Sequence, residues 1–160
     1  RQRQMCIRDS TICAGDSVTL SGAGAATYAW DNGVTDATAF TPTATATYTV
    51  TGTDTNGCVA TDAVDVTVNA LPAVDAGADL AVCDGGSVTL SGSGASTYSW
   101  DSGALIGVVF LPTSTTTYTV TGTDGNGCTD TDQITVNVTT NPTVDAGIDR
   151  TVCDLSLIHI

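Results

Sequence analysis

Lysine and glutamate are both missing from this chain of 160 residues, and basic residues of any kind are scarce. All 17 acidic residues are aspartates, and the formal net charge is −13. Lys and Glu favour helices, whereas Asp, Asn and Gly favour turns and the abundant Thr and Val favour strands. The composition therefore argues against a helical fold. The negative charge makes nucleic acid and anionic membrane surfaces poor partners.

Long apolar runs and a catalytic base are missing too. No stretch approaches the roughly 20 apolar residues of a membrane-spanning helix, so we predict no membrane insertion. His159, in the C-terminal flank, is the only histidine, so a Ser-His or Cys-His pair has no base. Asp101-Ser102-Gly103 resembles one triplet of an aspartic protease, which needs two carboxylates across a cleft. Its counterpart, Asp31-Asn32-Gly33, is a plain turn, and we predict that the protein is not an enzyme.

What the chain does contain is a repeat, because a shift of 70 residues lays it on itself without insertion or deletion. Residues 17–22 return as 87–92, and residues 48–54 return as 118–124. A third copy opens at Pro142. Self-similarity at a fixed period indicates an array of modules. We predict one module over residues 11–70, a second over 71–140, and the start of a third over 141–154.

The two ends depart from the repeat. Residues 1–10 and 155–160 resemble translated sequencing-adapter read-through, as found at the ends of assembled metagenomic fragments. We therefore treat both as non-native flanks and leave them out of the fold prediction.

Alternation of apolar and polar side chains predicts the strands. In the first repeat the alternating apolar residues are Val18 and Leu20, Tyr28 and Trp30, Tyr48 and Val50, and Val64, Val66 and Val68. A period of two with one apolar face is typical of half-buried antiparallel strands. Asn56-Gly57 and Asn126-Gly127 indicate hairpins with type I′ turns between the last two strands of each repeat. The pattern predicts an all-β fold: tandem β-sandwiches of about 70 residues with six or seven short strands each.

The aromatic residues predicted to lie in the cores are Trp30, Trp100, Tyr48 and Tyr118. Trp30 and Trp100 share a strand face with Tyr28 and Tyr98, and that face must cover the core; Tyr48 and Tyr118 lie on the next long strand. The alternative is an aromatic platform for sugars, which would leave the tryptophans exposed.

Taken as a set, these motifs resemble the immunoglobulin-like, PKD-like repeats of Bacteroidota cell-surface proteins, which are associated with gliding motility and type IX secretion. The motifs are Tyr28-Ala29-Trp30 with its copy, a Pro-Thr-rich corner before Tyr-Thr-Val-Thr, the Asp-x-Asn-Gly-Cys hairpin and the Val-Asp-Ala-Gly linker. The resemblance covers about residues 11–154. It implies immunoglobulin-like sandwiches and places Tyr48 and Tyr118 at the tyrosine corner of that fold.

Two cysteines per repeat predict disulfides and an oxidising, extracellular setting, and their spacing does not suit zinc. The spacing within each repeat suggests Cys13–Cys58 and Cys83–Cys128. In the strand order that the resemblance implies, however, Cys83 and Cys128 lie at opposite poles, about 20 Å apart, whereas a disulfide needs Cα atoms within about 7 Å. Cys13 would then reach Cys128 across the joint, and Cys58, Cys83 and Cys153 would await partners in other repeats. Both pairings stay open.

Carboxylates near the module ends suggest calcium, which binds carboxylate and carbonyl oxygens. The candidates in the linkers and hairpins are Asp75, Asp79, Asp124 and Asn126, together with Asp54, Asn56, Asp145 and Asp149. Calcium would stiffen the joint around Asp75 and Asp79. The alternative is a set of solvated turn residues and no cofactor.

The resulting functional hypothesis is a non-catalytic stalk or spacer of a secreted or cell-surface protein, which presents another domain or supports adhesion. Its partners would be the neighbouring repeats of the same chain and a surface glycan or protein. The alternative is a carbohydrate- or protein-binding accessory module of an extracellular enzyme.

Overall fold

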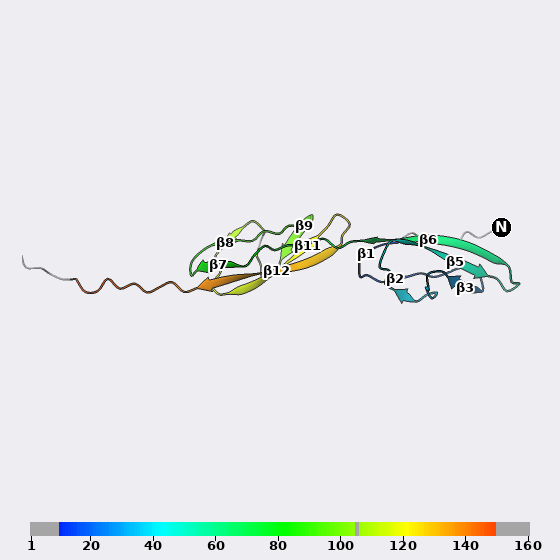
Figure 1. Ribbon diagram of the computed structural model, residues 1–160, viewed down its shortest axis with the longest axis horizontal. Helices are drawn as coiled ribbons and strands as arrows, with labels where there is room; N and C mark the ends of the chain where they lie inside the picture. Colours follow the sequence, from blue (N-terminus) through cyan, green and yellow to red (C-terminus); the bar gives the residue numbers. More distant parts are fainter. Residues whose placement is uncertain (1–9, 105, 150–160) are drawn as a thin grey trace, which may run out of the picture.

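The computed structural model describes residues 10–104 and 106–149, which form two modules lying end to end (Figure 1). These residues contain strands and no helix, and hence no helix that could cross a membrane. The predicted flanks fall almost entirely outside the described residues. The first module consists of β1 (Ser10–Cys13), β2 (Val18–Thr19), β3 (Thr27–Trp30), β4 (Ala39–Phe40), β5 (Ala46–Thr53) and β6 (Val59–Asn69). The second consists of β7 (Leu80–Cys83), β8 (Val88–Thr89), β9 (Thr97–Trp100), β10 (Val109–Phe110), β11 (Thr116–Thr123) and β12 (Thr129–Thr139).

Each module is a sandwich of a four-stranded sheet and a two-stranded sheet. The larger sheet has the order β1-β6-β5-β3 in the first module and β7-β12-β11-β9 in the second, while β2 pairs with β4 and β8 with β10. All pairs are antiparallel except β1 with β6 and β7 with β12, which are parallel. The predicted tandem immunoglobulin-like β-sandwiches are confirmed.

The parallel pairs fix one end of each module. Cys13 lies opposite Asn69, and Cys83 lies opposite Thr139, at the end where the last strand finishes. We call this end the exit pole, and the end that holds the β5–β6 or β11–β12 hairpin the hairpin pole. The chain therefore leaves each module beside a cysteine.

The cores form where the inward faces of the two sheets meet. Val50, Val66 and their counterparts Val120 and Val136 are fully buried, as their alternation predicts. Tyr48 and Tyr118 are also buried, and each meets a phenylalanine of the smaller sheet edge-on: Phe40 lies 5.2 Å and Phe110 lies 5.4 Å from its tyrosine, centroid to centroid. Edge-to-face pairs of this kind add to the energy of apolar burial.

The tryptophans differ from the prediction, because they are half-buried rather than buried. Trp30 pairs with Val50 and Trp100 with Val120 in the same register, so the two are structurally equivalent. Both pack against their cores from the margin. The reason is that β3 and β9 are edge strands, and the opposite sheet, with two residues in each of its strands, is too small to cover them.

The tyrosines whose hydroxyl groups bond to the backbone are not the ones predicted for the tyrosine corner. The Tyr28 hydroxyl accepts a hydrogen bond from the Ala25 N–H at 2.7 Å and donates one to the Ala25 carbonyl at 2.8 Å. Tyr98 does the same with Ala95. This arrangement has the local pattern of a tyrosine corner, but it lies at the start of β3 and β9 rather than at Tyr48 and Tyr118.

The hairpins form where Asn-Gly predicts them, but the predicted turn type is wrong. Gly57 has φ +82° and Gly127 has φ +86°, whereas neither Asn56 nor Asn126 has a positive φ. A type I′ turn needs positive φ at both central residues, so each hairpin instead closes with a longer loop that ends in a left-handed glycine.

The linker after the first module is part of the second. Asp75 and Ser93 exchange backbone hydrogen bonds of 3.0 and 2.9 Å, and Ala76 is buried in the core. Val74 packs on the bare backbone of Gly122, where an added Cβ would meet its Cγ2 at 2.5 Å. The segment around Asp75 and Ala76 therefore acts as the first edge of the second sandwich.

The linker also passes close to Gly94, which makes this position sensitive to substitution. A Cβ on Gly94 would lie 1.7 Å from the Ala73 carbonyl oxygen, and Gly94 has φ +87°. We expect Gly94→Ala to lower the free energy of unfolding of the second module by at least about 2 kcal/mol, because the linker must detach or the backbone must shift. Gly125→Ala is the matched control: Gly125 has open space around its Cβ position and no positive φ, so its effect should stay within about 0.5 kcal/mol. Urea unfolding followed by fluorescence measures both; equal effects would contradict the packing of the linker.

Candidate functional site

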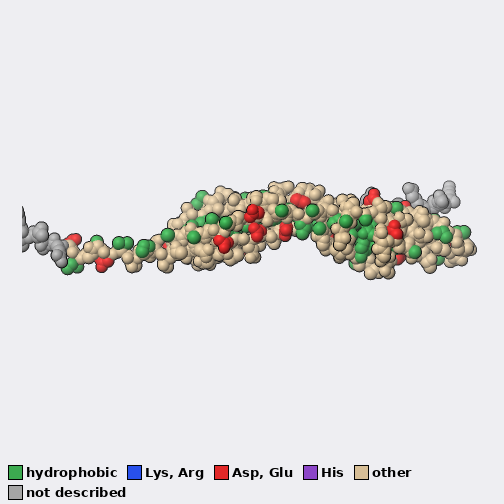
Figure 2. All heavy atoms as spheres, in the orientation of Figure 1, with side chains coloured by type: hydrophobic (Ala, Val, Ile, Leu, Met, Phe, Trp, Pro, Cys, Tyr) green, Lys and Arg blue, Asp and Glu red, His purple; other side chains and the backbone are tan. Residues whose placement is uncertain are grey.

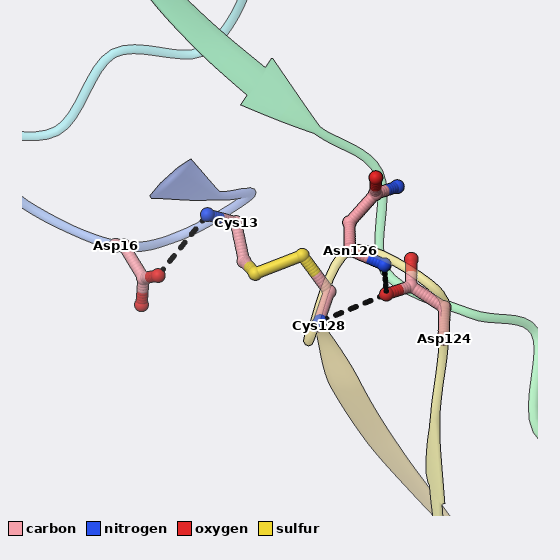
Figure 3. Close-up of a disulfide and its surroundings, with 5 residues drawn as sticks. All are labelled: Cys13, Asp16, Asp124, Asn126 and Cys128. Carbon is pink, nitrogen blue, oxygen red and sulfur yellow. Dashed lines mark hydrogen bonds between the residues drawn. A yellow bond between two sulfur atoms is a disulfide. The ribbon is translucent and has the colours of Figure 1, made fainter. Parts of the chain in front are cut away.

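A disulfide between Cys13 and Cys128 joins the two modules (Figure 3). The Cα atoms lie 5.6 Å apart, although 115 positions separate the cysteines in the sequence. The bond crosses from the exit pole of the first module to the hairpin pole of the second. The joint therefore has two covalent connections, the linker and the disulfide.

Cys13 is positioned by the end of β1. The Ala14 N–H donates to the Asn69 carbonyl at 2.8 Å, which continues the parallel pairing beyond Cys13. The Asp16 N–H donates to the Cys13 carbonyl at 3.0 Å, and the Asp16 carboxylate accepts from the Cys13 N–H at 3.1 Å. A tight turn thus holds Cys13 at the exit pole.

Cys128 is positioned by Asp124 in the hairpin. One carboxylate oxygen of Asp124 accepts hydrogen bonds from the N–H groups of Asn126 at 2.8 Å and Cys128 at 2.9 Å (Figure 3). Aspartate favours such loops because its short side chain can accept from backbone N–H groups nearby. Cys128 is only 1% exposed, so the disulfide is shielded on this side.

The cross-joint pairing predicted from the implied strand order is confirmed, and the pairing within each module is wrong. Cys58 and Cys83 are exposed free thiols. The physical reason is the parallel direction of β1 and β7, which carries Cys13 and Cys83 to the exit pole while Cys58 and Cys128 stay at the hairpin pole. Cys153 lies outside the described residues.

The predicted calcium ligands that are aspartates accept hydrogen bonds from backbone N–H groups. Asp75 accepts from the Gly77 N–H at 2.8 Å, and Asp79 accepts from the Thr135 N–H at 2.8 Å. Asp124 accepts from the N–H groups of Asn126 and Cys128, and Asn126 itself is exposed at the hairpin tip. Over residues 10–104 and 106–149 no three His, Cys, Asp or Glu side chains gather in a way that would hold a metal ion. Calcium binding at the joint stays a prediction.

Two of the remaining calcium candidates, Asp54 and Asp145, also accept from backbone N–H groups. Asp54 accepts from the N–H groups of Asn56 at 2.7 Å and Cys58 at 2.8 Å, so the first hairpin has the same loop as the second. Asp145 accepts from the Gly147 N–H at 2.7 Å, and Asp149 is exposed. Asp54 and Asp145 therefore organise turns.

Hydrogen bonding lowers the pKa of three carboxyls below its ordinary value. The Ala76 N–H, and after it the Gln133 N–H, lowers the pKa of Asp132; the first bond, of 2.8 Å, ties the linker to the second module. The Cys58 N–H, followed by that of Asn56, lowers the pKa of Asp54. The Trp30 indole N–H, followed by the Gly22 N–H, lowers the pKa of Asp36. In each case donors to the charged carboxylate favour its ionised form.

The aspartic-protease-like triplet is structural as well. Asp101 accepts from the Thr119 N–H at 3.0 Å, and Asp31 accepts from the Thr49 N–H at 2.9 Å. No charged residue is buried in the part of the chain that the structure describes. A close, buried pair of carboxylates is therefore not among the described residues.

The two modules differ at one position that sequence reasoning missed. In the first module the Trp30 indole N–H donates to Asp36 at 2.8 Å, and the same oxygen accepts from the Gly22 N–H at 2.7 Å. The repeat places Ile106 where Asp36 would be, and the buried indole nitrogen of Trp100 has no hydrogen-bond partner. The position was hard to find from the sequence, because residues 34–39 and 104–109 differ at all six positions and Ile106 does not stand out among them.

The same stretch of the second module carries an exposed aliphatic patch. Its side chains are 46–62% exposed and belong to Ile106, Val108, Val109 and Leu111. The first module has Asp36, Thr38, Ala39 and Thr41 at these positions. The fold does not need the apolar residues, because the first module forms without them.

Comparisons with known proteins concern the fold alone. No protein-family model and no curated protein matches the chain. The solved structure of the insect immune protein hemolin matches 83% of this chain and 45% of its own, at 15% identity and a TM-score of 0.42. Sidekick-1 immunoglobulin domains 1–4 match over 85% and 50%, at 14% identity and a TM-score of 0.35. The first two immunoglobulin domains of DIP-gamma match over 84% and 96%, at 13% identity and a TM-score of 0.35. The chain thus spans about half the length of the first two.

Opening the disulfide should destabilise both modules. A loop that closes over 115 positions restricts the unfolded chain strongly, and the chain-entropy model gives about 4 to 5 kcal/mol for the whole molecule. We expect a thiol reductant to lower the melting temperature of the native chain and to leave that of a Cys13→Ser, Cys128→Ser double variant unchanged. Circular dichroism measures both. An equal drop in the variant would show that the reductant acts elsewhere.

Substitutions at Ile106 test whether the missing acceptor for the Trp100 indole N–H lowers the stability of the second module. We expect Ile106→Asp to stabilise the second module by about 1 kcal/mol, because it supplies the acceptor that Trp100 lacks. Asp36→Ile should destabilise the first module by about 1 to 3 kcal/mol, because it leaves donors of Trp30 and Gly22 without their acceptor. Ile106→Ala is the control for losing the aliphatic side chain alone. Urea unfolding measures all three, and a less stable second module in Ile106→Asp than in Ile106→Ala would refute the explanation.

Proposed function

We propose that the chain is a non-catalytic structural and adhesive unit, a stalk or spacer of a secreted or cell-surface protein. The observation that carries the proposal is the disulfide that fastens consecutive modules end to end. Two domains joined by a linker alone move relative to each other by default. A second covalent connection removes most of that freedom, which is what a spacer needs and a hinge does not.

The surface supports the same proposal. The described residues include no Lys, Arg or His, and aspartates are scattered over the visible face (Figure 2). Like charges keep such molecules soluble and apart from one another. The disulfide suits an oxidising, extracellular setting. The sequence resemblance to PKD-like repeats of Bacteroidota surface proteins leads us to propose that class of protein as the source.

A protein-binding accessory module is the second candidate, and the aliphatic patch of Ile106, Val108, Val109 and Leu111 favours it. Exposed apolar patches often mark interaction sites. A glycan-binding platform is less favoured, because the exposed large apolar side chains within residues 10–104 and 106–149 are all aliphatic.

The native free cysteines allow a direct test of stiffness. Cys58 and Cys83 are exposed and lie at the two outer ends of the two-module unit, so dyes on both report its length. Cys6 and Cys153 are replaced by serine in every chain, so that the dyes attach only to Cys58 and Cys83. In single-molecule energy transfer we expect a narrow distribution for the chain with the disulfide and a broader one when Cys13→Ser and Cys128→Ser are added, because that variant keeps only the linker. The proposal fails if the chain with the disulfide gives as broad a distribution as the variant.

A further inference from the structure

We propose that Cys83 is the open half of a second joint, which binds the hairpin cysteine of a third module following residue 140. The inference rests on the proposed function as an array, and it names the partner of the exposed exit pole. The completed joint between Cys13 and Cys128 is the pattern for it, since Cys83 is the repeat counterpart of Cys13.

The exit pole of the second module already has the shape of a bonded one. Cys83 lies opposite Thr139 as Cys13 lies opposite Asn69. The Asp84 N–H donates to the Thr139 carbonyl at 2.8 Å, the same length as the bond from Ala14 to Asn69. The Gly86 N–H donates to the Cys83 carbonyl at 2.8 Å and closes the same turn. The two turns share their backbone hydrogen bonds and differ in one side chain, because Asp16 accepts from the Cys13 N–H and its counterpart Gly86 has no side chain to do so.

The hairpin half is also formed before any bond is made. Asp54 holds the N–H of the free Cys58 at 2.8 Å, and Asp124 holds that of the bonded Cys128 at 2.9 Å. Both hairpins close with a hydrogen bond from the aspartate N–H to the cysteine carbonyl, of 3.0 and 2.9 Å. The loop therefore does not depend on the disulfide for its shape, and a further copy of it would arrive ready to bond.

The segment after β12 repeats the linker that leads into a module. Pro142, Val144, Asp145, Ala146 and Gly147 match residues 72 and 74–77. The turn from Gly147 to Asp145, of 2.7 Å, copies the turn from Gly77 to Asp75, of 2.8 Å. Val144 is 91% exposed, whereas its counterpart Val74 packs against the core of the second module. This segment has an apolar side chain that a following module would cover. It leaves the end of β12 (Figure 1), where Cys83 lies opposite Thr139.

The bond forms by exchange with a small disulfide, of which oxidised glutathione is an example. The Cys83 thiolate attacks the small disulfide, forms a mixed disulfide and releases one small thiolate. The hairpin thiolate then attacks the Cys83 sulfur and releases the second small thiolate. The two protein thiols lose two electrons in total, the small disulfide is reduced to two thiols, and the two protein protons end on those thiols.

The test uses the full chain with residues 71–140 copied once more after residue 140, refolded in a glutathione buffer. Alkylation under native conditions and non-reducing peptide mapping then locate the bonds. We expect Cys83 to bond to the added hairpin cysteine and to be at least about tenfold less alkylated than in the parent chain, because the linker holds the partners at high effective concentration. In the extended chain with Cys83→Ser, the added hairpin cysteine should remain free.

The bond between Cys13 and Cys128 is the internal reference. If it forms while Cys83 reacts as fast as in the parent chain, the inference is wrong and the proposed spacer still stands. If it fails to form in the parent chain as well, the proposed function loses its main support. A covalent dimer through Cys83 of two extended chains would overturn the in-chain partner in favour of a second copy.

Discussion

The parallel pairing of the first strand with the last is the constraint on which the joint depends. Because β1 runs in the same direction as β6, its final residue lies beside the end of the module. A first strand of the opposite direction in the same place would put Cys13 opposite Val66, three positions back from the end of the module. At about 3.3 Å per residue this moves the cysteine by about 10 Å away from the next module, beyond the reach of a disulfide. The strand direction thus decides whether Cys13 can fasten one module to the next.

Much of the fold could be predicted from the sequence because the patterns that indicate strands and hairpins occur in both copies of the repeat. The alternation around Val50 and Val66 predicts the buried faces correctly, and the Asn-Gly pairs mark the hairpins. The half-burial of Trp30 could not be predicted in this way. Alternation shows which side of a strand faces inward, whereas the cover over that side depends on the width of the opposite sheet, and two very short strands cannot provide it.

The joint was harder to predict than the modules. The candidate cysteines were evident, but their pairing depends on strand direction, which residue patterns do not encode. The role of Asp36 was missed because a single aspartate in a loop resembles any solvated turn residue. Its partner bond to Trp30 becomes visible only in three dimensions, and the change to Ile106 does not stand out among the neighbouring positions where the modules differ.

The disulfide also determines how the molecule responds to a pulling force. Tension that enters before Cys13 and leaves after Cys128 passes through the sulfur bridge and bypasses the chain between them. At roughly 3.5 Å per residue, the 115-position loop contains about 400 Å of contour length that cannot be drawn out while the bridge is intact. A module that unfolds under load would lose its core but lengthen the molecule very little, and it would refold within a closed loop. Extensibility is then set by the redox state of one bond rather than by the strength of two small cores.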